Sequence, residues 1–361
     1  MPASRNRRAQ RPRRRRPATA PVTLRDVASA ARVAPSTASR ALAGDRRISP
    51  ATRAAVEQIA RRLGYAPNAL ARGLAGGGAD VIAVVIPRTA DYTFSSGFHL
   101  ALLKGISRVL QDAGQLLLLS FLDKRDYAEL HRSGLCRGVI VLMCRIGDAQ
   151  VGALARGRVP AVLIPGDPTL PGVASVNFDV AAPTAEAMRR LLDLGHRRIG
   201  FVGGAANSLF HRDRLAAFHQ ALAAGGLPAD PDLEAETNFT PTEACDRALE
   251  MLSAPRRPTA LVCSGDLMAQ GALAAAQKLG LRVPADLSLV SLSALPGPRV
   301  TTPRLAAVIS DFESAGATAA AMLLKLVATG PAPTAPVLLP TEFDAAASLA
   351  PPAPGTFAPP A

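Results

Sequence analysis

The segment from Pro35 to Leu42 combines short hydroxyl groups with one guanidinium at helical spacing. Ser36, Thr37, Ser39 and Arg40 all fall on the polar side of this segment. A guanidinium can bind the acceptor edge of guanine, and small side chains allow a helix to approach the bases in the major groove closely. The pattern therefore predicts contact with the base edges of double-stranded DNA. A generic three-helix bundle with a polar outer face is the alternative interpretation.

Three short helices must position this polar segment. The first is expected to start after Thr23, an N-cap residue, and it carries Asp26 in its first turn, where a carboxylate suits the free N–H groups. The second starts at Pro35 after a short turn. The third starts at Ser49 and ends before Gly64. Two short helices joined by a tight turn and braced by a third predict a helix-turn-helix.

The excess positive charge of the chain is confined to its N-terminal part. Residues 1–78 carry 17 Lys and Arg against three acidic residues, whereas the remainder carries 24 basic and 25 acidic residues. Residues 1–22 hold eight arginines, several prolines and no apolar period, which predicts a disordered arm. Such a charge distribution favours a polyanionic partner. A basic tail that serves only solubility is the other interpretation.

Patterns typical of enzymes, metal sites and membrane spans are missing from the sequence. There is no G-x-S-x-G, P-loop, H-E-x-x-H or G-x-G-x-x-G after a strand, and the five histidines are scattered. Cys136, Cys144, Cys245 and Cys263 show neither C-x-x-C nor paired-histidine spacing. The apolar runs are much shorter than the roughly 18 residues of a membrane span, and no secretory signal is present. We therefore expect a cytoplasmic protein without cofactor, metal or catalytic activity.

From Val81 onward, short apolar runs alternate with amphipathic segments. Strands are expected at 81–86, 116–120, 138–143, 161–164, 199–203, 260–264 and 287–292. Helices are expected at 100–113, 181–194, 212–224, 241–252 and 267–279. Buried strands separated by helices predict parallel sheets with helices on both faces. About 265 residues exceed one comfortable core, which predicts two such α/β lobes with a ligand cleft at the carboxyl ends of the strands.

Several longer motifs add a family resemblance. In the head they are Val22-Thr-Leu-Arg-Asp-Val-Ala, Ser36-Thr-Ala-Ser-Arg-Ala-Leu, Ser49-Pro-Ala-Thr-Arg and Leu63-Gly-Tyr-Ala-Pro-Asn-Ala-Leu-Ala-Arg-Gly-Leu. In the body they are Leu194-Gly-His-Arg-Arg-Ile-Gly-Phe-Val-Gly-Gly and Val283-Pro-Ala-Asp-Leu-Ser-Leu-Val. Across residues 22–345 the chain resembles the lactose-repressor family of bacterial transcription regulators. The resemblance implies a periplasmic-binding-protein-like body with an effector between its lobes, and repression as the commoner activity.

The resemblance also assigns roles within the second helix of the head. It implies that Pro35, Ser36 and Arg40 read the bases, although a proline cannot hydrogen-bond a base edge. Two further residues depart from the family pattern. Arg32 stands in the turn where the family usually has glycine, and we expect it to contact a phosphate. Ala34 replaces the usual serine cap, a loss of about 1 kcal/mol that Pro35 partly offsets.

The segment Pro67–Leu74 matches the family's hinge helix. It is too short to be stable alone, so we expect it to fold only when two copies meet on DNA. The resemblance implies that Leu74 wedges into the minor groove at the operator centre; a simple linker contact is the alternative. The residues expected to contact DNA are Thr23, Arg32, Pro35, Ser36, Thr37, Ser39, Arg40, Asn68 and Leu74.

Only some of the residues that bind the effector in this family have a match in this sequence. Arg214 matches the arginine that grips ligand oxygens, with a surface salt bridge as the alternative. Asp266 matches a family Asp-x-x-Ala position, whereas Ser293 lies where the family has its Tyr-Asp-Asp, so that carboxylate is absent. Phe98 and Phe178 are expected either to line the pocket or to pack in the core. A site poor in carboxylates disfavours sugars, so we expect a less polar or anionic effector held by Arg214, or none.

These inferences divide the chain into five parts. They are the arm 1–22, the helix-turn-helix head 23–66, the hinge and Gly linker 67–78, the two-lobed body 79–346 (first lobe 79–178 plus 310–335, second lobe 179–309 plus 336–346) and a disordered Pro/Ala tail 347–361. The tail has no heptad repeat, and we expect a homodimer on a palindromic operator in the nucleoid. A free-standing solute-binding protein and a non-specific nucleoid-type DNA binder are the alternatives.

Overall fold

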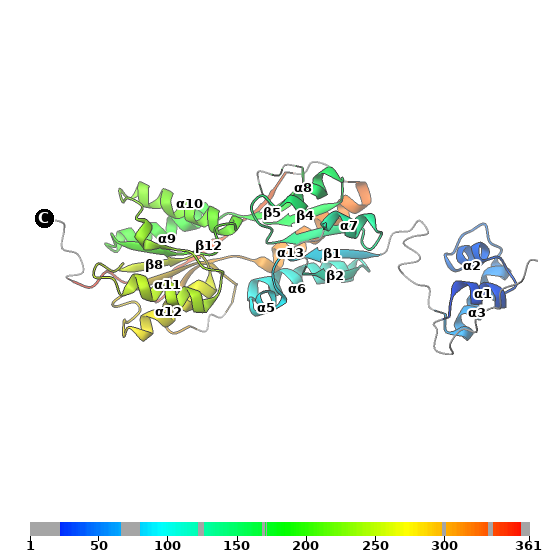
Figure 1. Cartoon of the computed structure of the whole chain (residues 1–361), viewed down its shortest axis with the longest axis horizontal. Helices are drawn as coiled ribbons and strands as arrows, with labels where there is room; N and C mark the ends of the chain where they lie inside the picture. Colours follow the sequence, from blue (N-terminus) through cyan, green and yellow to red (C-terminus); the bar gives the residue numbers. More distant parts are fainter. Residues whose placement is uncertain are drawn as a thin grey trace, which may run out of the picture. The chain divides into compact units, whose positions relative to one another are not determined.

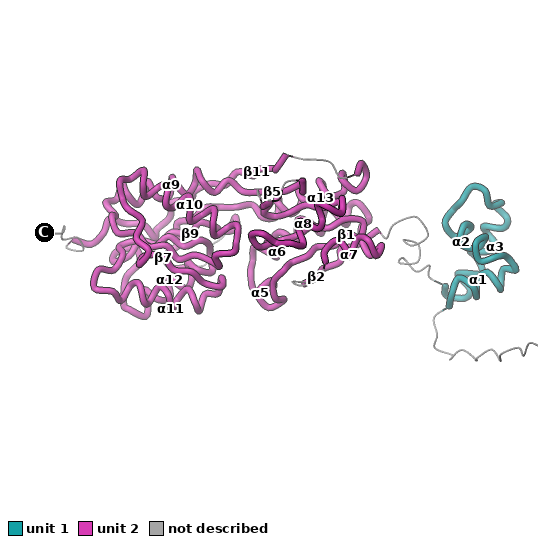
Figure 2. The backbone as a smooth tube through the Cα atoms, turned by 45° about the horizontal axis from the view of Figure 1, so that its top comes forward, with its two compact units in different colours: residues 1–77 teal, residues 78–361 magenta. Residues whose placement is uncertain are grey.

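The computed structural model describes residues 22–65, 80–121, 126–167, 170, 172–297, 301–330 and 335–354. The chain separates into two compact units, residues 1–77 and 78–361 (Figure 2). The first unit contains the head and the second contains the body. The expected arm up to residue 21, the hinge with Asn68 and Leu74, and the tail from residue 355 lie outside the described residues.

The head consists of helices α1 (Leu24–Ala30), α2 (Pro35–Leu42) and α3 (Pro50–Leu63). Each helix contributes two fully or almost fully buried residues to one small core. These residues are Val27, Ala28, Ala38, Ala41, Val56 and Ala60. Because four of the six are alanines, the helices can pack closely around a core that contains few large side chains.

The expected caps of the head helices are confirmed. The backbone N–H and the hydroxyl of Thr23 each donate to Asp26 Oδ2 at 2.7 Å, at the start of α1. At the start of α3, Ser49 Oγ accepts a hydrogen bond from the backbone of Thr52 at 3.2 Å. Helix α3 ends at Gly64, whose φ of +65° lies in the left-handed region that glycine adopts without strain.

The first lobe of the body is a parallel sheet with helices on both faces (Figure 1). In spatial order its strands are β11 (Val337–Leu339), β5 (Ala174–Phe178), β4 (Ala161–Ile164), β3 (Gly138–Leu142), β1 (Val81–Val85) and β2 (Leu116–Ser120). Its helices are α5 (Ala90–Ser95), α6 (Gly97–Asp112), α7 (Tyr127–Arg132), α8 (Ala149–Arg156) and α13 (Phe312–Thr329). Helices α6 and α13 contribute to one core cluster, and α7 and α8 to another.

The second lobe repeats this arrangement (Figure 1). In spatial order its strands are β12 (Glu342–Asp344), β10 (Ala306–Ile309), β9 (Ser288–Ala294), β8 (Ala260–Cys263), β6 (Ile199–Val202) and β7 (Glu234–Ala235). Its helical segments are α9 (Ala181–Asp193), α10 (Leu209–Ala224), the 3-10 turn η2 (Pro231–Leu233), α11 (Pro241–Leu252) and α12 (Asp266–Lys278). All described strand pairs are parallel except β10 with β12. The expected two-lobed α/β body is confirmed.

Helices α6 and α13 are in backbone contact. A Cβ atom at Gly105 of α6 would lie 1.9 Å from the carbonyl oxygen of Glu313, and one at Gly316 of α13 would lie 2.1 Å from that of Leu102. Two glycines therefore allow the helices to approach more closely than any other residue would permit. Helix α13 has no counterpart among the expected helices, yet it covers the sheet together with α6.

The chain crosses between the lobes three times, and the last crossing is later than expected. Strand β11 pairs in parallel with β5 of the first lobe, with Val337 opposite Val176. The prediction that residues 336–346 belong to the second lobe is therefore wrong for β11 and correct for β12 (Glu342–Asp344). A three-residue edge strand such as β11, with Leu338 62% exposed, has no local pattern that assigns it to a sheet.

The described start of the tail is ordered, which corrects the expected disorder from residue 347. Ser348 is fully buried, and its hydroxyl accepts from the backbone N–H of Ala306 at 2.8 Å. The backbone N–H of Ala350 donates to Ser288 Oγ at 3.0 Å, and a ring nitrogen of His196 lies 2.9 Å from the Ala350 carbonyl oxygen. Residues 347–354 are thus held to the second lobe by tertiary hydrogen bonds. No helix in the described part of the chain is both long and apolar enough to cross a membrane.

Candidate functional site

One face of helix α2 is exposed on the surface of the head. Pro35, Ser36 and Arg40 are exposed, whereas Thr37 and Ser39 are half-buried. Alanines on the opposite side of the helix fill the core, so the polar face is fixed outward by packing. The structure thus brings the expected base-reading residues together on one short helix, with the Arg40 guanidinium free to extend.

The turn before α2 holds a strained arginine. Arg32 has a φ of +53°, in the left-handed region, and its side chain is exposed. This conformation explains why a glycine suits the position, since a residue with a Cβ is destabilised there by about 1–2 kcal/mol. The N-cap residue of α2, Ala34, makes no side-chain cap. Thr23, also expected at the DNA surface, is half-buried and bonded to Asp26.

The loop after α2 is held by an ion pair of its own. Arg47 donates to Asp45 through Nε at 3.0 Å and Nη2 at 2.7 Å. These hydrogen bonds lower the pKa of Asp45 to about 2. The loop is also held from α3, since Arg53 Nη2 donates to the Asp45 carbonyl oxygen at 2.9 Å. Arg40 itself forms no ion pair with any residue described in the structure, so its charge is available to a partner.

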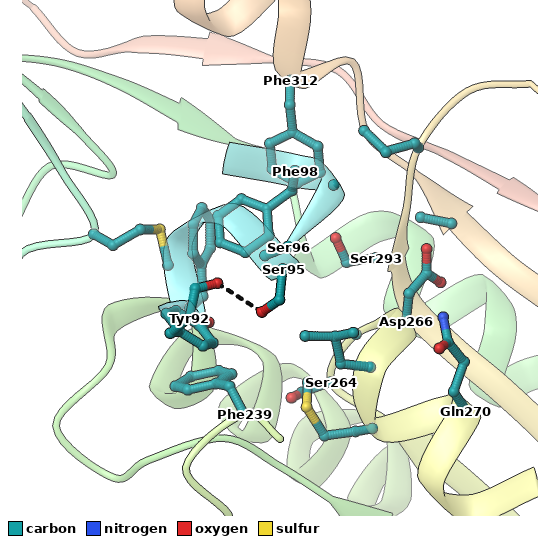
Figure 3. Close-up of a pocket in the computed structure, with 18 of the residues that line it drawn as sticks. Tyr92, Ser95, Ser96, Phe98, Phe239, Ser264, Asp266, Gln270, Ser293 and Phe312 are labelled. Carbon is teal, nitrogen blue, oxygen red and sulfur yellow. Dashed lines mark hydrogen bonds between the residues drawn. The ribbon is translucent and has the colours of Figure 1, made fainter. Parts of the chain in front are cut away.

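The second candidate site is a pocket of about 300 Å³ between the two lobes of the body (Figure 3). Its first-lobe wall comes mainly from α5 and the start of α6, and its second-lobe wall from α10, the start of α12 and the end of β9. Of the five residues expected at an effector site, four line this pocket. They are Phe98, Arg214, Asp266 and Ser293.

The fifth residue, Phe178, does not line the pocket, which corrects that expectation. It is 6% exposed, with its ring 4.8 Å from that of Phe312 and 6.1 Å from that of Phe210. Phe312 and Phe210 are themselves pocket residues, so Phe178 supports the aromatic wall from behind. The core-packing alternative for Phe178 therefore describes its position.

Arg214 is the cation of this pocket and is almost completely buried. Its side chain on α10 is 5% exposed, and the guanidinium Cζ lies 4.8 Å from the centre of the Phe210 ring. Burial lowers the pKa of Arg214 to about 10, and the charges of Asp213 and Asp266 oppose this shift. Nε of Arg214 has no hydrogen-bond partner among the described residues. Because an unpaired buried donor is destabilising, this atom is suited to a ligand acceptor.

Polar groups from the second lobe line the pocket together with Arg214. Asp266 occupies the first turn of α12 and accepts a hydrogen bond from Ser291 Oγ at 3.1 Å. Ser264 is fully buried, and its hydroxyl finds no partner within the described chain. Figure 3 shows Asp266, Gln270 and Ser293 on the side of the pocket opposite Tyr92, Phe98 and Phe239. The pocket therefore has a polar side and an aromatic side.

The aromatic side was only partly foreseen from the sequence. Tyr92, Phe210, Phe239 and Phe312 line the pocket in addition to Phe98. Phe210 lies one helical turn before Arg214, and this i, i+4 spacing was a usable signal. No local signal identified the other three, because they approach the pocket from three different segments.

These aromatic residues also join the two lobes. Phe210 of the second lobe packs into the main core cluster of the first, whereas Tyr92 of the first lobe packs beside Phe239, with ring centres 6.3 Å apart. The backbone N–H of Ile146 donates to the Asn207 carbonyl oxygen at 2.9 Å across the same seam. A molecule in the pocket would therefore touch the aromatic residues that join the lobes.

Comparison with known proteins gives two matching family models. "Bacterial regulatory proteins, lacI family" matches residues 23–68, and "Periplasmic binding protein-like domain" matches residues 188–348. Catabolite control protein A of Priestia megaterium is 30% identical over 310 residues, covering 84% of this chain and 92% of that protein. The HTH-type transcriptional repressor CytR of Escherichia coli (strain K12) is 30% identical over 309 residues, covering 84% and 89%.

Solved structures show the same similarity in three dimensions. The lac repressor dimer bound to operator and the anti-inducer ONPF superposes with a TM-score of 0.74 and 26% identity, covering 92% of this chain and 100% of that one. The complex of the transcriptional regulator CelR with cellobiose gives a TM-score of 0.67 and 26% identity, covering 91% and 99%.

Proposed function

Because the chain belongs to the lacI family of bacterial regulatory proteins, whose members are DNA-binding transcription regulators and not enzymes, we propose that it represses transcription from a palindromic operator as a homodimer. A small-molecule effector in the interlobe pocket modulates this binding. The observation that carries the proposal is the exposed α2 face of Ser36 and Arg40, set by packing on a basic head. A regulator that binds the chromosome acts in the cytoplasm, at the nucleoid.

Each of the head residues makes a different contact with the DNA. Arg40 supplies the bidentate donor for a guanine edge, Ser36 adds a short hydroxyl, and Pro35 offers an apolar contact. Thr37 and Ser39, which are half-buried, position the helix at the backbone. Arg32 contacts a phosphate, which adds affinity without sequence preference. Asn68 and the Leu74 wedge complete the contact from the hinge.

An exposed apolar edge of the first lobe supports the homodimer. Strand β2 is the last strand of its sheet, and its Leu116 and Leu117 are 61% and 37% exposed. Phe94, 51% exposed, lies beside Phe121 at the end of this strand, with ring centres 5.5 Å apart. An unprotected apolar edge strand invites pairing with another chain. A second copy of the same edge, related by two-fold symmetry, covers it and matches the palindrome.

The pocket supports an effector with an apolar, ring-shaped body and an anionic group. Phe98 and Phe239 provide faces for the body, and Arg214 is the only cation among the described pocket residues. Its unpaired Nε and the unpaired Ser264 hydroxyl are suited to acceptor atoms. A neutral hexose would supply no charge to the buried Arg214, which has Asp213 and Asp266 nearby but no ion-pair contact with a described carboxylate. Although the complex of the similar CelR contains cellobiose, the expected effector here is less polar or anionic.

Regulation follows from the position of the pocket between the lobes. An effector that contacts Phe98 on one lobe and Arg214 on the other has an affinity that depends on the lobe arrangement. By linkage, such a ligand shifts the arrangement only as far as its two affinities differ. The spacing of the two hinges in the dimer changes with it, and so does operator affinity.

Genomic selection with the purified full-length chain tests the proposal. Sheared DNA of the source organism is bound at moderate salt, eluted and sequenced. A shared palindrome with a central CG step is the expected outcome, and the genes beside it nominate effectors. Recovery of fragments in proportion to their length would contradict sequence-specific regulation and favour a non-specific DNA binder. Titration of the same protein with carboxylates and hexoses tests the pocket, and a hexose as the tightest ligand would contradict the effector class.

A further inference from the structure

A second cavity between the lobes, of about 870 Å³, has no lining residue in common with the effector pocket. Arg88 and Arg145 of the first lobe form part of its wall, and Asn207 and Thr237 belong to the second-lobe side. The proposed mechanism uses none of these residues. The cavity lies at the seam where the backbone of Arg145 forms a β-bridge with Ser208 of the second lobe.

The two arginines are neighbours because of the sheet topology. Arg88 follows β1 and Arg145 follows β3, and these strands pair in parallel with Val84 opposite Ile140. Their carboxyl ends therefore meet at one edge of the sheet. Burial lowers the pKa of Arg88, and the like charge of Arg145 lowers it further. A half-buried positive charge is thus held near a second, exposed one.

The Arg88 guanidinium lacks the partners that such a position requires. Its Nη2 is buried and makes no hydrogen bond to any described residue. Within the described chain, no carboxylate oxygen lies within 4 Å of a nitrogen of Arg88 or Arg145. By contrast, the half-buried Arg198 pairs with Asp230 at 2.7 Å. A buried, unpaired guanidinium N–H is destabilising unless something binds it.

The carboxylates of the same cavity do not fill this role. Glu243 accepts hydrogen bonds from the backbone and side chain of Asn238, the shorter at 2.6 Å, and Glu250 pairs with Arg247 at 2.9 Å. Glu236 and Asp246, which also line the cavity, are exposed and lie beyond ion-pair distance from both arginines. The positive charge is therefore on the first-lobe wall and the negative charge on the second-lobe wall.

The start of α10 adds to the positive side of the seam. Ser208, bridged to Arg145, is the N-cap residue of this 16-residue helix, and its side chain makes no cap hydrogen bond. A helix N-terminus carries a partial positive charge that favours anions. The helix start is adjacent in sequence to Asn207, which lines the cavity together with Arg88 and Arg145.

We propose that Arg88 and Arg145 bind a phosphate group at the seam between the lobes, separately from the effector pocket. The planar guanidinium matches the oxygen spacing of a phosphate and can bind two oxygens at once. The bound group is either free inorganic phosphate or the phosphoryl group of a small metabolite. Both arginines belong to the first lobe, so that lobe holds the phosphate, next to the β-bridge between Arg145 and Ser208. The inference goes beyond the proposed function and does not depend on the identity of the effector.

Isothermal titration of the full-length chain in phosphate-free buffer at constant ionic strength tests the proposal. The probes are inorganic phosphate and a sugar phosphate, with the unphosphorylated sugar as a reference. Arg88→Gln and Arg145→Gln are each expected to weaken binding about tenfold or more, since one charged hydrogen-bond donor is lost. Arg145 is exposed, so its replacement leaves the fold unaffected. Tighter binding of the sugar phosphate than of inorganic phosphate would identify the metabolite as the source.

Two control variants separate this site from other anion binding. Arg156→Gln removes the same charge from an exposed position on α8 of the first lobe, and Arg214→Gln removes the cation of the effector pocket. Arg156→Gln is expected to keep the wild-type affinity for phosphate within twofold, whereas Arg214→Gln reports phosphate that binds in the effector pocket instead. An equal loss in Arg156→Gln, or no phosphate binding by the wild-type chain, would overturn the proposal. Loss in Arg214→Gln but not in Arg88→Gln would also overturn it, while supporting an anionic ligand in the effector pocket.

Discussion

The guanidinium of Arg214 lies over the ring of Phe210, one turn earlier on α10, with Cζ 4.8 Å from the ring centre. These two adjacent side chains have different environments. Phe210 packs into the core of the first lobe, whereas Arg214 faces the pocket. The aromatic face also partly compensates the burial of the charge. A ligand that contacts Arg214 would therefore lie next to a residue that joins the lobes.

Replacement of Arg214 by Gln is expected to weaken effector binding without affecting operator binding. Loss of a buried charged donor weakens binding of an anionic ligand by about 1.5–3 kcal/mol, which is about 10- to 150-fold in Kd. Titration with a panel of aromatic and aliphatic carboxylates measures the change. Arg212→Gln on the same helix, which removes a surface pair with Asp213, is the control and should bind as the wild type does. Equal affinity in Arg214→Gln and wild type would exclude this anchor.

Replacement of Arg40 by Ala is expected to relax base preference at one position of each half-site. A bidentate contact to guanine discriminates by about 1–3 kcal/mol. The mutant homodimer loses this contact in both half-sites, so it should bind the selected palindrome more weakly by about 2–6 kcal/mol, which is at least about 30-fold. Affinity for random DNA should change little. Binding to a library of single-base operator variants measures this effect. A uniform loss over all sequences would show that Arg40 contacts only phosphate.

Replacement of Arg32 by Gly is expected to make the head more stable while it weakens binding to DNA. Glycine relieves the left-handed strain at this position, which stabilises the head by up to about 1 kcal/mol after the entropy of glycine is subtracted. Loss of the charge lowers affinity for all DNA and reduces the salt slope by about 0.9 per phosphate contact. Hydrogen exchange of the head in the full chain and binding at several salt concentrations measure the two effects. Slower hydrogen exchange in the mutant head would support the backbone strain at Arg32. An unchanged salt dependence of DNA binding would show that Arg32 does not contact a phosphate.

His99 is expected to make the body less stable in acid. Its ring is fully buried beside Phe98 and Tyr92, and neither nitrogen has a hydrogen-bond partner among the described residues. Burial, with a smaller effect of the Arg88 charge, lowers the pKa of His99 to about 3. Below about pH 6.5 the His99 ring therefore binds a proton in the unfolded chain but stays neutral in the folded chain. The free energy of unfolding consequently decreases as the pH falls from 6.5 towards 3.

The size of this effect can be isolated by substitution. One such group reduces the free energy of unfolding by up to about 1.4 kcal/mol per pH unit in this range. His99→Leu, similar in volume, removes the titrating group and should show a correspondingly smaller pH dependence in urea unfolding at pH 7 and pH 5. Parallel curves for the two proteins would mean that His99 is hydrated or paired in solution.

Replacement of Leu116 by Lys is expected to dissociate the proposed dimer. A charge on an edge strand opposes pairing with a second copy, and the dimer dissociation constant should rise at least about tenfold. Leu338→Lys on β11, the opposite edge of the same sheet, is the matched control because Leu338 is equally exposed, at 62%. Sedimentation velocity over a concentration series measures both. Dissociation by Leu338→Lys alone would show that the dimer interface lies at the β11 edge and not at β2.

Much of the architecture could be predicted from the sequence because it depends on local rules. The caps Thr23 and Ser49 and the left-handed Gly64 delimit the head helices by interactions within a few residues. The alternation of apolar runs and amphipathic segments likewise indicated two parallel sheets. Four of the five proposed pocket residues lie at the pocket, since the carboxyl ends of parallel strands meet at one edge.

What the sequence by itself determined is therefore the identity of the head, the sign and place of its charge, and the class of the body. Only the tertiary structure decided that Phe210 and not Phe178 faces the pocket, that β11 joins the first lobe, and that Ser348 is buried in the second. It also decided that Arg88 and Arg145 meet at the seam. The physical reason is that these outcomes depend on contacts between segments more than thirty residues apart, which leave no periodic signal in the chain.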